Sequence, residues 1–281
     1  MAGQASEFDP FAVPLSPAAT VMLVRDGDEG LDVFMLRRTL SAVFAGGMYV
    51  FPGGRVDDAD RADDATRLCD GLTDADASGM LGVPNGGLAY WVAAIRECFE
   101  EAGVLLARSP NGAVVRFDDP ATEGRFNEHR HAIHDGRLSL AEVCATEQLR
   151  LVTDDIRYVS HWITPIGERR RFDTRFLLAR APHAQQPLHD DAETIESLWV
   201  KPAVALERFR AGELAMIVPT VANLEFLVPH ATADEALHAA ERIATPPPIL
   251  PKLKIDRDGR VVAIVLPGEP DYETMSAMHI V

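Results

Sequence analysis

The chain has 281 residues, of which 47% are hydrophobic and 25% charged, and its formal net charge is −16. This length suits one medium domain with additions, or at most two small domains with packed cores. The acidic balance argues against nucleic acid or an anionic membrane as a partner, because both are bound through stripes of Lys and Arg. No stretch approaches 18 uninterrupted apolar residues, so no transmembrane helix is expected. The widely spaced, odd set of three cysteines suits a reducing compartment and a cytoplasmic protein.

Periodicity and turn signals predict alternating strands and helices. Residues 1–17 are Pro-rich and are expected to be irregular, and one domain is expected over 18–281. The first half is predicted to contain strands at 18–25 and 31–38, an insertion over 57–87 with one helix at about 60–72, a helix at 90–103, and two helices within 118–150. The second half is predicted to contain strands at 159–163, 175–180 and 195–200, an extension from about 202 with helices at 202–210, 220–227 and 233–243, and a hairpin of 253–255 with 261–266.

The helix expected at 90–103 carries the most informative pattern. Glu97, Glu100 and Glu101 fall at relative positions 0, +3 and +4 and share one narrow arc. Like charges at such spacings repel by about 0.2–0.5 kcal/mol per pair, and a hard divalent cation would relieve that repulsion. An acidic, solvated face remains the alternative on spacing alone. The opposite side is an apolar stripe of Val92, Ile95, Phe99 and Ala102, and Gly103 is expected to end the helix.

The segment from Arg96 to Val104 (Arg-Glu-Cys-Phe-Glu-Glu-Ala-Gly-Val) resembles the second half of the Nudix box of diphosphate hydrolases. The first half resembles Gly54 to Asp60, with Asp60 where that family has Glu. The 35 residues between Asp60 and Arg96 (61–95) replace the usual seven. A split box preceded by Phe-Pro-Gly-Gly-Arg-Val-Asp is similar to the coenzyme A diphosphatase branch, the Nudix 19-like proteins. Further similar segments are Leu36-Arg37-Arg38, Trp162-Ile163-Thr164-Pro165, Arg171 to Phe176, and Trp199.

The resemblance implies an α/β fold, the Nudix α/β/α sandwich with a mixed sheet, here with a helical insertion and C-terminal helical additions. It also implies Mg²⁺ or Mn²⁺ bound by Glu97, Glu100 and Glu101, with the Gly54 carbonyl as a further ligand. The implied reaction is hydrolysis of a diphosphate bond in a small molecule, with coenzyme A or acyl-CoA as substrate. ADP-ribose and NADH stay open as substrates, because the stretch 43–48 lacks the His-containing segment of many coenzyme A hydrolases. A non-catalytic nucleotide-sensing domain also stays open, as does assembly into a homodimer.

Catalytic and binding roles follow from the same resemblance. Glu97 and Glu101 are candidate catalytic residues, and Glu193 is preferred among the acids of the later loop (Asp190, Asp191, Glu193 and Glu196). Arg96 is expected to brace the helix through either Asp60 or Glu97. Guanidinium groups bind phosphate oxygens in bidentate fashion, and the candidates for the substrate are Arg37, Arg55, Arg171 and Arg175. The string His129, His131 and His134 is not expected to bind zinc, because His131 points away from the other two on a helix.

Overall fold

The computed structural model describes residues 8–40, 45–187 and 194–280. The chain divides into two compact units, the larger formed by 18–160 and 175–246, and the smaller by 161–174, 247–281 and the described part of 1–17. The strands are β1 (Leu15–Gly27), β2 (Gly30–Arg38), β3 (Tyr49–Val50), β4 (Gly53–Arg55), β5 (Cys69–Asp70), β6 (Ala107–Arg108), β7 (Arg150–Val152), β8 (Arg157–Ile163), β9 (Arg171–Arg180), β10 (Thr194–Val200), β11 (Pro248–Ile249), β12 (Lys252–Ile255), β13 (Val261–Val265) and β14 (Met278–Ile280). The helices are α1 (Asp63–Arg67), α2 (Asp74–Leu81), α3 (Leu88–Ala102), α4 (Pro120–His134), α5 (Leu140–Thr146), α6 (Pro202–Arg210), α7 (Val218–Leu227) and α8 (Ala233–Glu241).

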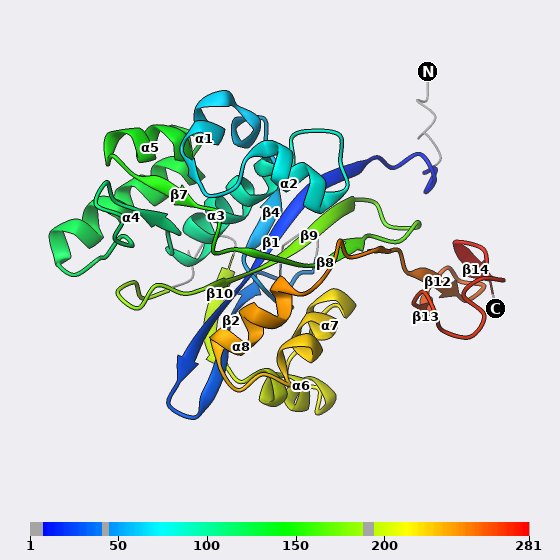
Figure 1. The fold of residues 1–281 in the computed structure, drawn as a ribbon. Helices are drawn as coiled ribbons and strands as arrows, with labels where there is room; N and C mark the ends of the chain where they lie inside the picture. Colours follow the sequence, from blue (N-terminus) through cyan, green and yellow to red (C-terminus); the bar gives the residue numbers. More distant parts are fainter. Residues whose placement is uncertain (1–7, 41–44, 188–193, 281) are drawn as a thin grey trace, which may run out of the picture. The chain divides into compact units, whose positions relative to one another are not determined.

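The main sheet of the larger unit is covered on both faces. Its strands lie in the order β10-β2-β1-β9-β8, with β3 beside β2 and β4 beside β1. On β1, Val21 and Leu23 belong to the same core as α3, while Met22 and Val24 on the other face are also fully buried. In Figure 1, helices α1–α5 gather on one side of this sheet and α6–α8 on the other. The predicted α/β class and the C-terminal helical additions are confirmed.

Helix α3 forms where the sequence predicts it and ends as predicted. Val92, Ile95, Phe99 and Ala102 are at most 1% exposed and form the stripe that faces the core. Gly103 adopts the left-handed conformation (φ 69°), which glycine enters without the steric cost of a Cβ atom. The three cysteines, Cys69, Cys98 and Cys144, are buried and free. Burial raises the pKa of each thiol.

The insertion before α3 differs from its prediction. The single helix expected at about 60–72 is wrong, because the segment forms a 3₁₀ turn (Ala59–Arg61), the short helix α1 and the strand β5. A second helix, α2, was not predicted. It begins at a capping box in which the Thr73 side chain accepts from Asp76 N while the Asp76 carboxylate accepts from Thr73 N. The capping box fixes where α2 begins, so α2 is a helix separate from α1.

The smaller unit contains a three-stranded sheet of its own. Strand β12 pairs antiparallel with β13, which confirms the expected terminal hairpin, and pairs parallel with β14. Strand β11 pairs with His161 and Trp162 of β8. Within this unit the His161 ring lies 2.5 Å from Asp173 Oδ1, and Arg171 Nε donates to Thr164 O at 3.1 Å.

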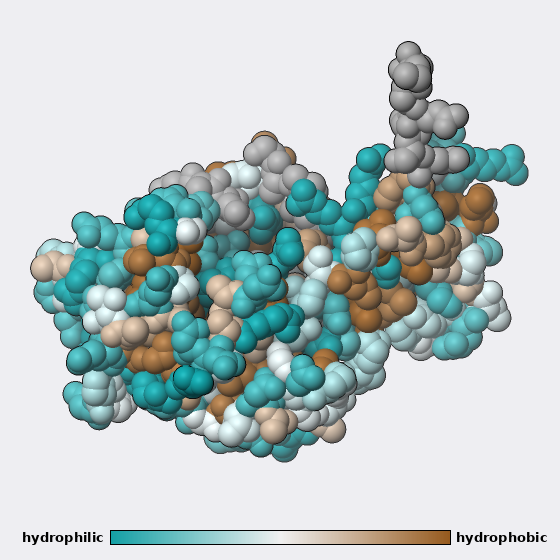
Figure 2. Space-filling model, turned by 90° about the horizontal axis from the view of Figure 1, so that it is seen from above, coloured by the Kyte–Doolittle hydropathy of each residue, from teal (hydrophilic) through white to brown (hydrophobic). Residues whose placement is uncertain are grey.

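Polar side chains dominate the surface that Figure 2 shows. In Figure 2, the face in view is mostly hydrophilic, and hydrophobic side chains show in separate groups. None of the helices in the described parts of the chain has the length and apolar character needed to cross a membrane.

Candidate active site

The three acidic side chains of α3 lie on one arc of the helix, and all three are largely withdrawn from solvent. The exposed fraction of the side chain is 5% for Glu101, 14% for Glu100 and 15% for Glu97. An acidic face that merely solvates a helix would be exposed. Burial of three carboxylates is costly unless each is paired, so the alternative of a solvated face is wrong.

The Gly53-Gly54 backbone of β4 packs directly against two of these carboxylates. Gly53 N donates to Glu101 Oε2 at 2.9 Å. A Cβ atom at position 54 would lie 2.3 Å from Glu97 Oε1, and one at position 53 would lie 2.6 Å from Ala19 O. The two glycines are therefore required for close approach of backbone and carboxylates.

We expect Gly54→Ala to displace the Glu97 carboxylate and lower both stability and turnover. Forcing one methyl group into a filled site typically costs about 1–3 kcal/mol. Gly124→Ala on α4 is the matched control, because a Cβ there meets no atom within 4 Å. Thermal unfolding and initial rates would be measured on both variants. A Gly54→Ala protein that behaves as Gly124→Ala does would contradict the packing described above.

Arg96 connects the acidic arc to the first half of the split motif. Its Nε and Nη2 donate to the two oxygens of Asp60 at 2.9 and 3.0 Å, and Nη1 donates to Glu97 Oε1 at 2.8 Å and Glu100 Oε1 at 2.9 Å. Nη2 also donates to Arg55 O at 2.8 Å. Asp60, which is 1% exposed, is fixed further by Asp57 N at 2.8 Å. The sequence left Asp60 and Glu97 as alternative partners for Arg96, and the structure shows both.

The electrostatics of the site favour a cation. Burial raises the pKa of the Glu97 carboxyl, and the neighbouring Glu100 and Asp60 carboxylates raise it further, while Arg96 opposes both effects. Asp60, Glu97 and Glu100 all contact Arg96, and Glu101 Oε1 lies 3.5 Å from Arg38 Nη1. Such a gathering of carboxylate oxygens is the chemistry that a hard divalent cation prefers.

Residues 73–227 match the family model of the NUDT19 Nudix domain, and this range is more than half of the chain. The chain belongs to the NUDT19 Nudix domain family. The matched range includes helix α3 with its three glutamates and Arg96.

Individual relatives agree with the family. The acyl-coenzyme A diphosphatase NUDT19 of Gallus gallus is 27% identical over 292 aligned residues, which cover 86% of this chain and 74% of the relative. The Homo sapiens protein of the same name is 28% identical and covers 87% and 73%. Among solved structures, a Nudix hydrolase from Alicyclobacillus acidocaldarius aligns with a TM-score of 0.64 and 26% identity, over 84% of this chain and all of that one. The predicted Nudix fold is confirmed.

Arg38 contacts the Glu101 carboxylate, with 3.5 Å between its Nη1 and Glu101 Oε1, and it was not among the arginines that the sequence singled out. Side chains alternate along β2, so Arg38 continues the face of Phe34 and Leu36, which belong to the α3 core. Arg37 lies on the opposite face, where its Nη1 is 3.4 Å from Glu196 Oε2 and its Nε donates to Gly47 O at 3.4 Å. The period of two along this strand was the signal that could have selected Arg38 over Arg37.

The remaining candidate residues are dispersed. Arg55 is exposed beside Gly54 and contributes its carbonyl to Arg96. Arg175 is 3% exposed, and its guanidinium lies 5.5 Å from the ring centre of Tyr90 in the first turn of α3. Arg171 belongs to the smaller unit. Glu193 lies outside the described residues, together with Asp190 and Asp191. The substrate-binding roles of these arginines stay predictions.

The predicted ligands, which are the carboxylates of Glu97, Glu100 and Glu101 and the Gly54 carbonyl, fit a hard divalent cation in their chemistry. Carboxylate oxygens and a backbone carbonyl are the ligands that Mg²⁺ and Mn²⁺ prefer. Within 8–40, 45–187 and 194–280, no three His, Cys, Asp or Glu side chains converge in the geometry of a metal site, since Glu97 and Glu100 are turned to Arg96. His129 contacts Glu147, His134 lies 4.0 Å from Glu100, and His131 is exposed, so the His string does not converge either.

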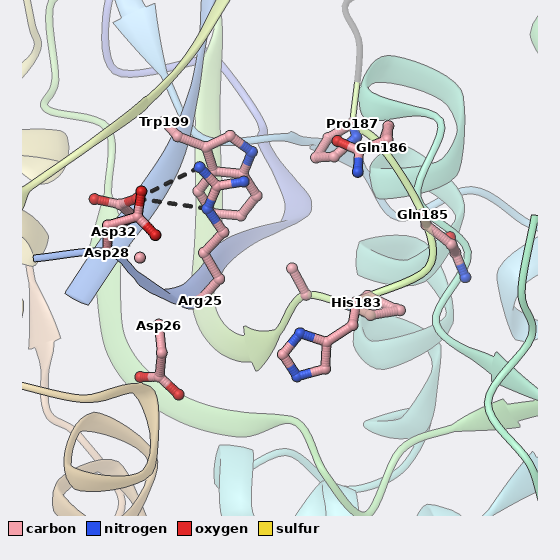
Figure 3. A pocket seen from close by; sticks show the side chains of 12 residues that line it. Arg25, Asp26, Asp28, Asp32, His183, Gln185, Gln186, Pro187 and Trp199 are labelled. Carbon is pink, nitrogen blue, oxygen red and sulfur yellow. Dashed lines mark hydrogen bonds and ion pairs between the residues drawn. The ribbon is translucent and has the colours of Figure 1, made fainter. Parts of the chain in front are cut away.

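Cavities lie both beside this site and away from it. One of about 450 Å³ is lined by Arg96 and Glu100 and by residues between Ile133 and Glu142. Another of about 350 Å³ is lined by none of Asp60, Arg96 and the three glutamates, and it is shown in Figure 3. There the Arg25 guanidinium stacks 4.1 Å from the ring centre of Trp199 and contacts Asp32 Oδ2 at 3.4 Å. Trp199 thus packs between Arg25 and the Phe34 ring, whose centre is 5.3 Å from its own.

Proposed function

We propose that this chain hydrolyses the diphosphate bond of a coenzyme A-linked substrate with a divalent cation held by α3. The observation that carries the proposal is the buried trio of glutamates packed against the Gly53-Gly54 backbone. A structural helix gains nothing from three carboxylates at these spacings. Relatives named acyl-coenzyme A diphosphatase support the class of substrate.

Nudix hydrolases generally use divalent metal ions, and we propose Mg²⁺ or Mn²⁺ here. Glu97, Glu100, Glu101 and the Gly54 carbonyl would hold the ion, in agreement with the chemistry of these oxygen donors. When bound, such an ion stabilises negative charge on the diphosphate and activates water. The chain has a net charge of −16, and its negative potential would repel an anionic diphosphate. A bound cation would make the potential at the site favourable for that substrate.

The chain's own residues supply orientation and proton transfer. Arg38 lies beside Glu101, and we propose that its fork of donors would contact diphosphate oxygens. We propose Glu97 as the proton acceptor. Burial raises the pKa of its carboxyl toward neutral pH, where a general base works best. Arg55 lies in the same strand as the glycine pair and is the nearest in sequence of the predicted phosphate-binding arginines.

A hydrolysis panel tests this function. The purified chain would be incubated with Mg²⁺ or Mn²⁺ and with coenzyme A, acyl-CoA, ADP-ribose, NADH and nucleoside triphosphates, and the products would be resolved by mass. We expect 3′,5′-ADP and a phosphopantetheine from coenzyme A or its acyl form. Preferred cleavage of ADP-ribose or NADH would instead support the alternative substrates. Metal binding without hydrolysis of any compound would indicate a nucleotide-sensing domain and overturn the proposal.

A further inference from the structure

The C-terminal end of α3 carries two of the three glutamates, and its backbone carbonyls have no partner within the helix. The last four carbonyls of any helix need partners from elsewhere. In α3 the last four carbonyls are those of Phe99, Glu100, Glu101 and Ala102. Phe99 O accepts from Gly103 N at 3.0 Å, and Cys98 O, one residue earlier, accepts from Val104 N at 3.4 Å, which is the usual pattern at a left-handed glycine. The next two carbonyls belong to Glu100 and Glu101, which are residues proposed to hold metal.

Arg130 binds both of these carbonyls from a different helix. Its Nε donates to Glu100 O at 2.7 Å, and its Nη2 donates to Glu101 O at 2.9 Å. The residue is 7% exposed, and its Nη1 lies so close to Gly103 that a Cβ there would be 3.2 Å away. A guanidinium presents its donors in a rigid fork, so two contacts to consecutive carbonyls fix both peptide groups at once.

Helix α4 is anchored on the same side of α3 by packing. One turn before Arg130, the Phe126 ring lies edge-on to Phe99 of α3 with 6.4 Å between ring centres, and it stacks on Phe117 at 4.7 Å. One turn after Arg130, His134 Nδ1 lies 4.0 Å from Glu100 Oε2. Residues 126, 130 and 134 are spaced by four and therefore share one face of α4. This face of α4 packs along the last turn of α3.

We propose that Arg130 is a positioning residue for Glu100 and Glu101, a role that rests on the proposed metal-dependent function. By fixing the two carbonyls it fixes the directions of the two Cα–Cβ bonds, from which the carboxylates reach the cation. Its positive charge also lies at the negative end of the helix dipole, beside an arc that is rich in carboxylates. A segment outside the Nudix box thus sets the geometry of the box.

The test compares Arg130→Met and Arg130→Lys with Phe126→Leu in the full-length chain. Phe126→Leu loosens the packing of the same helix but leaves the guanidinium in place. Four quantities would be measured: the melting temperature, the Kd of Mn²⁺ by calorimetry, kcat and KM for the hydrolysed substrate, and hydrogen exchange at the α3 end in metal-free protein.

We expect Arg130→Met to lower kcat and weaken Mn²⁺ binding by about 10–100-fold each, the usual range for residues that orient metal ligands. Its KM should change little, and exchange at Gly103 and Val104 should accelerate. Arg130→Lys should fall between wild type and Arg130→Met, because an ammonium keeps the charge but not the fork. Phe126→Leu should leave kcat and the Kd of Mn²⁺ close to wild type even where its melting temperature falls.

Wild-type kcat and Mn²⁺ affinity in Arg130→Met would overturn the inference, and so would an equal loss in Phe126→Leu at the same melting temperature. If Arg130→Met does not fold, the comparison of Arg130→Lys with Phe126→Leu decides by the same criteria. A wild-type protein that hydrolyses nothing would refute the proposed function alone, since Mn²⁺ binding and exchange would still report on Arg130.

Discussion

Glu101→Gln is expected to lower kcat by more than about 100-fold while the fold survives, because loss of a partner that merely orients a ligand already costs about 10–100-fold. Glu101 is the most buried of the three glutamates, and Gly53 N donates to its Oε2. Glutamine has the same shape, and its amide oxygen can accept the same hydrogen bond. The substitution therefore removes the negative charge and leaves the packing in place.

Product formation by mass spectrometry and thermal unfolding by circular dichroism would be followed together for Glu101→Gln. The matched control is Glu128→Gln, the same change at an exposed position of α4. The control should retain wild-type turnover and melting temperature. Wild-type turnover in Glu101→Gln, with unaltered unfolding, would remove Glu101 from the catalytic site.

The sequence predicts most of what positions this site. Apolar residues recur at regular spacing along α3 and β1, because each element buries a continuous apolar face. The left-handed Gly103 confirms the predicted end of the helix. Pairing of Arg96 with Asp60 follows from the motif, although 35 residues (61–95) separate them. These features are local, or they are fixed by the spacing of the motif.

Other features of the site could not be predicted, because they depend on contacts between residues whose positions in the sequence follow no regular pattern. Arg130 binds carbonyls about 30 positions earlier in the chain, and neither its segment nor its charge marks it out among the arginines. The capping box at Thr73 was overlooked because Asp occupies the position where Glu or Gln is typical. The contact of Arg38 with Glu101 could have been expected from the alternation of β2, whose limits were predicted correctly, while the role of Arg37 stays a prediction.

Arg96→Met is expected to destabilise the fold by about 3–5 kcal/mol, the usual cost of removing one partner from a buried ion pair. The Arg96 side chain is 10% exposed, and its loss would leave the carboxylates of Asp60, Glu97 and Glu100 without their shared donor. The control is Arg67→Met, which removes an exposed pair with Asp63 and should cost at most about 0.5 kcal/mol. Chemical denaturation of the two variants would measure the difference.

The destabilisation in Arg96→Met should also depend on pH. Burial already raises the pKa of Glu97 above its ordinary value of 4.5, and the positive charge and hydrogen bond of Arg96 oppose this rise. Without Arg96 the pKa of Glu97 in the folded protein rises further above its value in the unfolded chain. The contribution of Glu97 to the free energy of unfolding is therefore kept below the unfolded-state pKa, and it is lost as the pH rises through the folded-state pKa. The gap in unfolding free energy between wild type and Arg96→Met should therefore be smaller at about pH 5 than at about pH 8. A gap that is constant with pH would mean that Arg96 stabilises the helix by packing and not by holding the Glu97 carboxylate ionised.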